Sequence, residues 1–284
     1  MISAGVGVLD DLRRTFAAGA ERSDMGRFSL SRRLGALVLI CAAAATGGCA
    51  ERPTAPPPGE RDFVSIGDVD PTILVDARYY GDHNFIGTRI AGYEAPKCLL
   101  TRQAAAALAE VQRELRPMNL TLKTYDCYRP QRAVDQFVAW ANNLDDVKMK
   151  KEFYPAVDKA DLFRHGYIAE KSGHTRGSTV DLTIVALPAP AAEQYRAGDP
   201  LRECFLPADQ RFRDESLDFG TGFDCFDPAA HTANPTTGGT QRALRALLAD
   251  AMSDHGFKNL AEEWWHFTLR DEPFPNTYFD FPVR

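Results

Sequence analysis

Hydrophobic and polar residues alternate along residues 177–185 (GSTVDLTIV), which predicts a strand with Asp181 on its polar face. Three further stretches are rich in β-branched and aromatic residues, namely 72–80, 120–128 and 264–269. The pattern therefore predicts a sheet of several strands.

Apolar residues recur at helical spacing in three other segments. The first spans Thr101–Arg116 and stops before Pro117, the second begins at Pro130, and the third spans 240–257 with Gly256 as its C-terminal cap. Helices and strands are mixed without regular β-α-β alternation. This favours an α+β fold, a single domain with a mostly antiparallel sheet flanked by helices.

The first 49 residues differ from the rest of the chain. A basic segment at 27–33 precedes an apolar segment at 34–45, which is short for a membrane span, and TGGC follows, ending at Cys49. This order is typical of a bacterial export signal. Small residues before Cys49 resemble a lipobox, so that lipidation of Cys49 and simple cleavage nearby both remain open. Residues 50–61 form a Pro-rich linker.

We therefore expect an exported protein of the periplasm or cell envelope, with membrane contact only through such a lipid anchor. Residues 62–284 have the length of one catalytic domain. The net charge of -6, without a basic block beyond the leader, argues against nucleic acid as a partner. Neither length nor charge fixes the oligomeric state.

Beyond the leader and Cys49 the chain has four cysteines: Cys98, Cys127, Cys204 and Cys225. In an oxidising compartment an even set favours two disulfides, and four cysteines allow three pairings. We favour the pairs that are local in sequence, Cys98–Cys127 and Cys204–Cys225, over free buried thiols. The absence of C-x-x-C spacing argues against a zinc cluster of cysteines.

Two of the six histidines lie close to carboxylates in the sequence. His174 precedes Asp181 by seven residues, and His266 follows Glu263 by three. Two imidazoles and one carboxylate leave the fourth tetrahedral position open, as in a catalytic zinc site, and Glu263 would be the base that takes a proton from water.

The stretch EEWWH also has the spacing of the zinc-protease pattern H-E-x-x-H, with Glu262 in place of the first histidine. That pattern requires a helix, whereas Trp264–Leu269 is bulky and favours a strand. We therefore reject the helical interpretation. Considered singly, His266 could equally be a buried core residue and Asp181 a carboxylate at a turn.

Three ordered segments resemble the D-alanyl-D-alanine dipeptidases of the VanX type, zinc peptidases of the superfamily that includes D,D-carboxypeptidases and Hedgehog domains. They are YDCYRPQRAV at 125–134, SGHTRGSTVD at 172–181 and EWWH at 263–266. Further likeness, in RYYGDHNF, DFGTGFD and the C-terminal residues, extends the resemblance over roughly residues 62–284.

The resemblance implies one zinc ion per chain, bound by His174, Asp181 and His266. It implies Glu263 as general base and then acid, and Arg129 as the cation that stabilises the oxyanion. Without the flanking match, Arg129 would be interpreted as half of a salt bridge.

The resemblance also implies that Asp224 pairs with the substrate ammonium and that Ser172 and Tyr79 line the pocket. Gly173 stands where relatives often carry Ser, which implies one pocket hydrogen bond fewer. Residues 188–216 form a longer loop than the family pattern, and a bond from its Cys204 to Cys225 would reshape the rim of the pocket.

The resemblance therefore implies hydrolysis of D-Ala-D-Ala. An exported enzyme cannot deplete a cytoplasmic pool of this dipeptide, so we expect a role in cell-wall turnover or scavenging. Two alternatives remain: a D,D-carboxypeptidase acting on peptidoglycan stem peptides, and a non-catalytic zinc-bearing envelope protein. Asp224 argues against the first alternative and Glu263 against the second.

Overall fold

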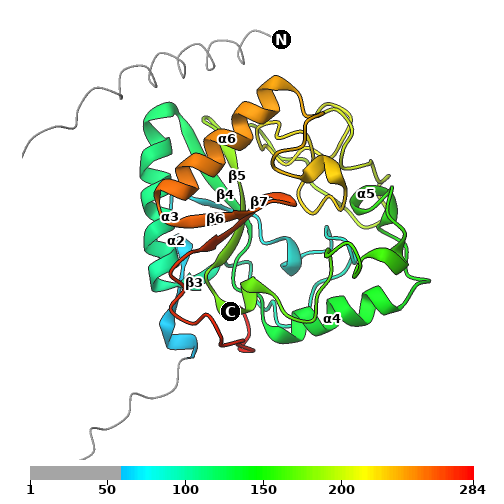
Figure 1. Cartoon of the computed structure of the whole chain (residues 1–284), viewed down its shortest axis with the longest axis horizontal. Helices are drawn as coiled ribbons and strands as arrows, with labels where there is room; N and C mark the ends of the chain where they lie inside the picture. Colours follow the sequence, from blue (N-terminus) through cyan, green and yellow to red (C-terminus); the bar gives the residue numbers. More distant parts are fainter. Residues whose placement is uncertain (1–58) are drawn as a thin grey trace, which may run out of the picture. The chain divides into compact units, whose positions relative to one another are not determined.

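A five-stranded sheet forms the centre of the part of the chain that the computed structural model describes, residues 59–284 (Figure 1). Its strand order is β2-β4-β5-β7-β6. Their bounds are Leu74–Val75 for β2, Leu120–Asp126 for β4, Thr179–Ala186 for β5, Phe257–Leu260 for β6 and Glu263–Leu269 for β7. Only β2 and β4 pair in parallel, which confirms the predicted α+β fold with a mostly antiparallel sheet.

Two long helices, α3 (Arg102–Leu115) and α6 (Gly239–Asp254), pack against one face of this sheet (Figure 1). Their apolar residues share a core with Val180, Leu182 and Ile184 of β5. The third long helix, α4 (Gln131–Asn142), belongs to a separate aromatic cluster. Asp181 points away from the α3–α6 core, because strand residues alternate between faces.

The remaining elements are short. They are β1 (Phe63–Ser65), α2 (Ile66–Val69), β3 (Leu99–Thr101), α5 (Lys150–Phe153) and the 3-10 helices η1 (Glu60–Asp62), η2 (Arg78–Tyr80), η3 (Arg116–Met118), η4 (Lys159–Asp161), η5 (Gly173–Arg176) and η6 (Pro228–Ala230). β1 and β3 form a separate two-stranded sheet.

Most predicted boundaries agree within a few residues. Thr101 caps α3 by accepting a hydrogen bond from the backbone of Ala104, and Gly256 follows α6 with φ of +89°. The predicted strand at 72–80 is wrong for most of its length. Residues Arg78–Tyr80 form η2 instead of a strand, because the Arg78 side chain is buried and binds Asp76 and the sequence-distant Asp214.

The predicted export signal and Cys49 lie outside the described residues, as does most of the predicted linker. The last residues of that linker belong to η1 instead, whose backbone is held by Asp62. No helix within residues 59–284 has the length and apolar character needed to cross a membrane.

Both disulfides that we favoured are formed. Cys98 pairs with Cys127, across 29 residues of sequence, and Cys204 pairs with Cys225, across 21. The first joins the residue before β3 to the residue after β4, and the second joins two loops. All four cysteines are buried.

Gly177 is required by the turn that ends η5. Its φ is +81°, in the left-handed region, and its N–H donates to the carbonyl of His174. A Cβ atom there would lie 2.0 Å from the ring of Phe63. That ring also packs against the rings of Tyr128, Phe279 and Phe281, which oppose its displacement.

We therefore expect Gly177→Ala to lower the free energy of unfolding by about 2–5 kcal/mol, the sum of a left-handed backbone and an overpacked core. Gly198→Ala is the matched control, because Gly198 has φ of +97° with open space around its Cα. It should lose only the backbone part, about 1–2 kcal/mol. Equal losses in urea denaturation would contradict the role of Phe63.

Candidate metal centre

Three neighbouring strands each place one polar side chain in a row across the sheet. In the strand register Asp126 of β4 is opposite Asp181 of β5, and Asp181 is opposite His266 of β7. Residues opposite each other in antiparallel strands point to the same face. A register irregularity between Thr124 and Asp126 brings Asp126 into this row.

His174 reaches the row from η5. Its Nε2 lies 3.3 Å from Asp181 Oδ2 and 3.3 Å from His266 Nδ1. Its other nitrogen, Nδ1, donates to the carbonyl oxygen of Cys127 at 2.7 Å. A protonated Nδ1 leaves the lone pair on Nε2, which is the form of imidazole that binds a metal.

The donor atoms of His174, Asp181 and His266 lie within 4.8 Å of one another, close enough to bind one ion. Two nitrogens and one carboxylate oxygen are a donor set that zinc accepts, with one tetrahedral position left for water or substrate. Asp181 Oδ1 is buried without a hydrogen-bond donor, although it lies 3.0 Å from His266 Nδ1. An ion at this point would satisfy it, so the residues present fit the metal.

The electrostatics of the cluster favour a cation. Burial opposes a charge on the His266 imidazole, yet Asp181 and Glu263 together raise its pKa to about 10, so the cluster attracts positive charge, which a metal ion would supply in place of the proton. Burial also opposes the charge on Asp181, but His174 and His266 hold the pKa of that carboxyl well below its usual range. The carboxylate of Asp181 is therefore ionised at neutral pH, as a metal ligand must be.

Glu263 lies beside the three donors without being one of them. Its Oε2 is 3.3 Å from His266 Nδ1, and its side chain is partly exposed. In a regular strand, residues three apart point to opposite faces. Here the β6–β7 register shifts between Asn259 and Leu260, and both intervening tryptophans are buried, so Glu263 and His266 face the same cavity.

Arg129 lies on the other side of the cluster. Its Nε donates to Asp126 Oδ2 at 2.9 Å, while one terminal nitrogen lies 3.8 Å from Asp181 Oδ2. The guanidinium also lies over the rings of Tyr79 and Phe137, at about 5 Å from each centroid. These contacts fix its orientation, with its charge directed toward the metal ligands.

One cavity of about 210 Å³ is lined by the side chains of His174, Asp181, His266, Glu263 and Arg129. The volume is below the roughly 300–1,000 Å³ of sites for drug-sized ligands, so a small substrate fits it best. Tyr79, Ser172 and Asp224 line the same cavity. The structure thus brings together every catalytic, metal-binding and substrate-binding residue that the sequence predicted.

Asp224 is a buried carboxyl group at the wall of this cavity. Its Oδ2 accepts a hydrogen bond of 2.8 Å from the Tyr79 hydroxyl. Burial raises the pKa of Asp224 well above its ordinary value, and the charge of Asp181 adds to the rise. A cation bound next to Asp224 would relieve both effects. Ser172 caps η5 and accepts from the backbone N–H of His174.

Sequence reasoning missed Asp126. This residue is buried, lies 3.4 Å from His174 Nδ1, and receives a hydrogen bond of 2.6 Å from the Tyr93 hydroxyl. It therefore orients Arg129, through the hydrogen bond from Nε, and places a negative charge beside His174. The signal was its place within YDCYRP, two residues from a predicted strand end. Tyr93 carried no comparable signal.

Three metal donors, an adjacent carboxylate and a fixed arginine around a small cavity are the groups that a metal-dependent hydrolase needs. The comparisons agree with that class. A family model described as D-Ala-D-Ala dipeptidase (peptidase M15) matches residues 59–189 and 210–284. The chain therefore belongs to the D-Ala-D-Ala dipeptidase family and is a metallopeptidase.

Three relatives are named D-alanyl-D-alanine dipeptidase. The one from Streptomyces coelicolor is 35% identical over 222 residues, which is 78% of this chain and 98% of the relative. Those from Enterococcus faecalis and Enterococcus faecium are 33% and 32% identical, over 79% of this chain and 99% and 100% of the relatives.

Among solved structures, the zinc complex of a VanY D,D-pentapeptidase variant covers 70% of this chain and 87% of its own, with 14% identity and a TM-score of 0.33. This likeness is too remote to support any conclusion about function.

The metal ligands and the base are separable by mutation. We expect His174→Ala and His266→Ala to lose the metal, because two donors cannot hold zinc as three do. Glu263→Ala should keep one zinc per chain and lose activity by several orders of magnitude, because it removes the group that moves the proton. Metal analysis and turnover of each purified variant test this. A full zinc equivalent in either histidine variant would refute the ligand assignment.

Proposed function

We propose that this chain is a zinc dipeptidase that hydrolyses D-Ala-D-Ala to two D-alanines. The observation that carries the proposal is the combination of the three metal donors, the adjacent Glu263 and the buried Asp224 around one small cavity. The names of the relatives supply the substrate. A bound zinc ion supplies Lewis-acid chemistry at the three donors.

Glu263 moves the proton in this reaction. Its carboxylate takes a proton from the attacking water as the C–O bond forms, and delivers it to the leaving nitrogen as the C–N bond breaks. The side chain suits this role because it is not one of the three donors and remains partly exposed.

Arg129 stabilises the negative charge that develops on the carbonyl oxygen of the substrate. The guanidinium is held by Asp126 before the substrate arrives, so little reorganisation is needed during the reaction. Removing one such donor typically costs about 10²–10³ in kcat.

Asp224 gives the cavity its preference for a free amino terminus. A carboxylate buried beside the Tyr79 hydroxyl binds an ammonium well, whereas an acylated nitrogen has no charge and needs additional space. A dipeptide with both ends free is therefore the substrate we favour over a peptidoglycan stem peptide.

The proposed location is the cell envelope, and the proposed role is cell-wall turnover or scavenging of D-alanine. Two disulfides favour an oxidising compartment. The leader sequence, with its export pattern and Cys49, supports the same location.

Release of D-alanine from D-Ala-D-Ala is the direct test. We expect turnover by the zinc-loaded chain, loss of turnover after a chelator, and recovery on adding zinc. The same assay on an N-acetylated D-Ala-D-Ala should give a much lower kcat/KM. A preference for the acylated substrate would favour a D,D-carboxypeptidase, and zinc binding without any release would favour a non-catalytic protein.

Arg129→Met tests the oxyanion role. We expect kcat to fall about 10²–10³-fold with a small change in KM, because the interaction is made in the transition state. Arg132→Met is the control, because Arg132 pairs with Asp280 at the surface instead. A loss of zinc or an unchanged kcat in the Arg129 variant would contradict the assignment.

A further inference from the structure

The family model does not match residues 190–209, which lie between β5 and the loop that carries Asp224. This inserted segment is covalently joined to that loop, because its Cys204 forms a disulfide with Cys225, the residue directly after Asp224. The backbone N–H of Gly222 also donates to the carbonyl of Cys204, at 2.8 Å. The Asp224 loop is thus bonded to Cys204 on both sides of Asp224.

The inserted segment is itself fixed to the rest of the protein. The N–H of Cys204 donates to the carbonyl of Glu152 in α5, at 3.0 Å. The Glu152 carboxylate binds His83 Nε2 at 2.8 Å, and the His83 ring stacks on Tyr195 of the inserted segment, with centroids 4.4 Å apart. Since Glu152 and His83 are buried, Cys204 is attached to a rigid part of the fold.

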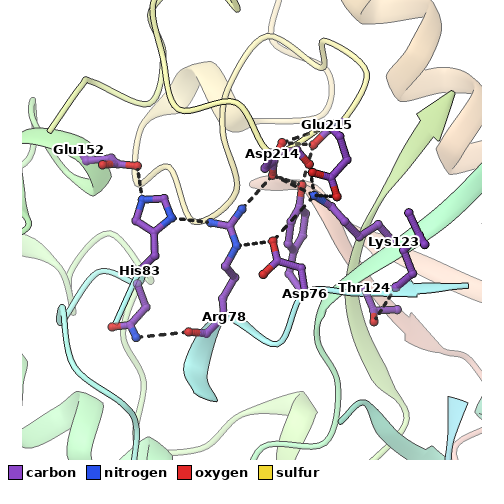
Figure 2. A network of polar contacts seen from close by, with 12 residues as sticks. Asp76, Arg78, His83, Lys123, Thr124, Glu152, Asp214 and Glu215 are labelled. Carbon is purple, nitrogen blue, oxygen red and sulfur yellow. Dashed lines mark hydrogen bonds and ion pairs between the residues drawn. The ribbon is translucent and has the colours of Figure 1, made fainter. Parts of the chain in front are cut away.

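The same network extends to the helical turn that carries Tyr79. Figure 2 shows His83 next to Arg78, which in turn binds Asp76 and Asp214. Asp214 lies just after the inserted segment, and Lys123 completes the group 3.5 Å from it. Tyr79, the residue after Arg78, donates to Asp224. Tyr79, the donor, is therefore held through Arg78 and Asp214, and Asp224, the acceptor, is held through the Cys204–Cys225 disulfide.

Asp224 needs such support. Its φ is +55°, a left-handed conformation that an L-residue other than glycine adopts at a cost. It is also a buried carboxyl group, and both costs persist only where surrounding bonds hold the residue.

We propose that the Cys204–Cys225 disulfide is a positioning element for Asp224, and that it thereby sets the preference for substrates with a free amino terminus. The inserted segment is the fixed support, and the cross-link transmits its position to the carboxylate. The inference rests on the proposed function of Asp224. The disulfide itself touches neither the metal donors nor the base, so it acts on substrate binding and leaves proton transfer unchanged.

The test compares Cys204→Ser/Cys225→Ser with the unaltered full chain, both loaded with zinc. We expect KM for D-Ala-D-Ala to rise about tenfold to a hundredfold, because hydrogen bonds to charged groups contribute to affinity by about that factor. The kcat should change by less than about threefold, and the zinc content should not change. The preference for the free dipeptide over its N-acetyl form should fall by the same factor as kcat/KM. A merely structural loss would instead lower kcat and zinc occupancy for both substrates alike.

Two further variants make the result specific. In an Asp224→Asn background, removing the disulfide should have no further effect on KM, because the two changes act through the same group. Asp199→Ala disturbs the turn of the inserted segment, where Asp199 accepts from the N–H of Arg196, but keeps the cross-link, so KM should be unchanged. Additive effects with Asp224→Asn, or an unchanged KM in the disulfide variant, would overturn the proposal.

If the serine pair does not fold, Cys204→Ala/Cys225→Val replaces it, because an apolar pair keeps the buried contacts of the two cysteines. Failure of even this pair to fold would overturn a role confined to positioning. If the unaltered chain does not release D-alanine, the proposed function fails. If it does release D-alanine and the disulfide variant equals it, only the positioning role fails.

Discussion

The register of three antiparallel strands is the constraint on which this site depends. Pairing places Asp126, Asp181 and His266 in one row, so two metal donors and the carboxylate behind them are fixed by backbone hydrogen bonds of the sheet. Shifting one strand by a single residue would turn its side chain to the opposite face. The packing of α3 and α6 on that opposite face opposes such a shift, because it would expose the apolar residues of β5. The same strand register thus determines both the packing of the core and the geometry of the metal centre.

The site also needs His174 and Glu263, which lie outside the row of Asp126, Asp181 and His266. Each of the two is positioned by a different structural feature. The position of His174 is fixed by the left-handed turn at Gly177 and by the hydrogen bond to the carbonyl of Cys127. Cys127 is itself cross-linked to Cys98. Glu263 depends on an irregularity in the β6–β7 register. Both register shifts in the five-stranded sheet lie next to the metal centre, one before Asp126 and one opposite Glu263.

The identity of the metal donors could be predicted from the sequence more fully than their arrangement in space. Alternation along β5 placed Asp181 on the face away from the core, and this placement is correct. The same reasoning applied to β7 would separate Glu263 from His266, because alternation says nothing about a bulge that depends on pairing with β6. Asp126 could not be recognised either, because its role comes from contacts with residues distant in sequence. The predicted strand at 72–80 was wrong because Arg78 belongs to a buried ionic network with Asp76, His83 and the sequence-distant Asp214 (Figure 2).

The inserted residues 190–209 follow the end of β5 and contribute no strand to the sheet. Two of the metal donors thus lie on paired strands, whereas Asp224, to which we assign the selectivity, lies on a loop joined to the inserted segment. A loop of this kind can change in length and sequence while the strand register stays constant. An insertion after the central strand β5 therefore leaves the strand pairing that fixes the metal donors unchanged.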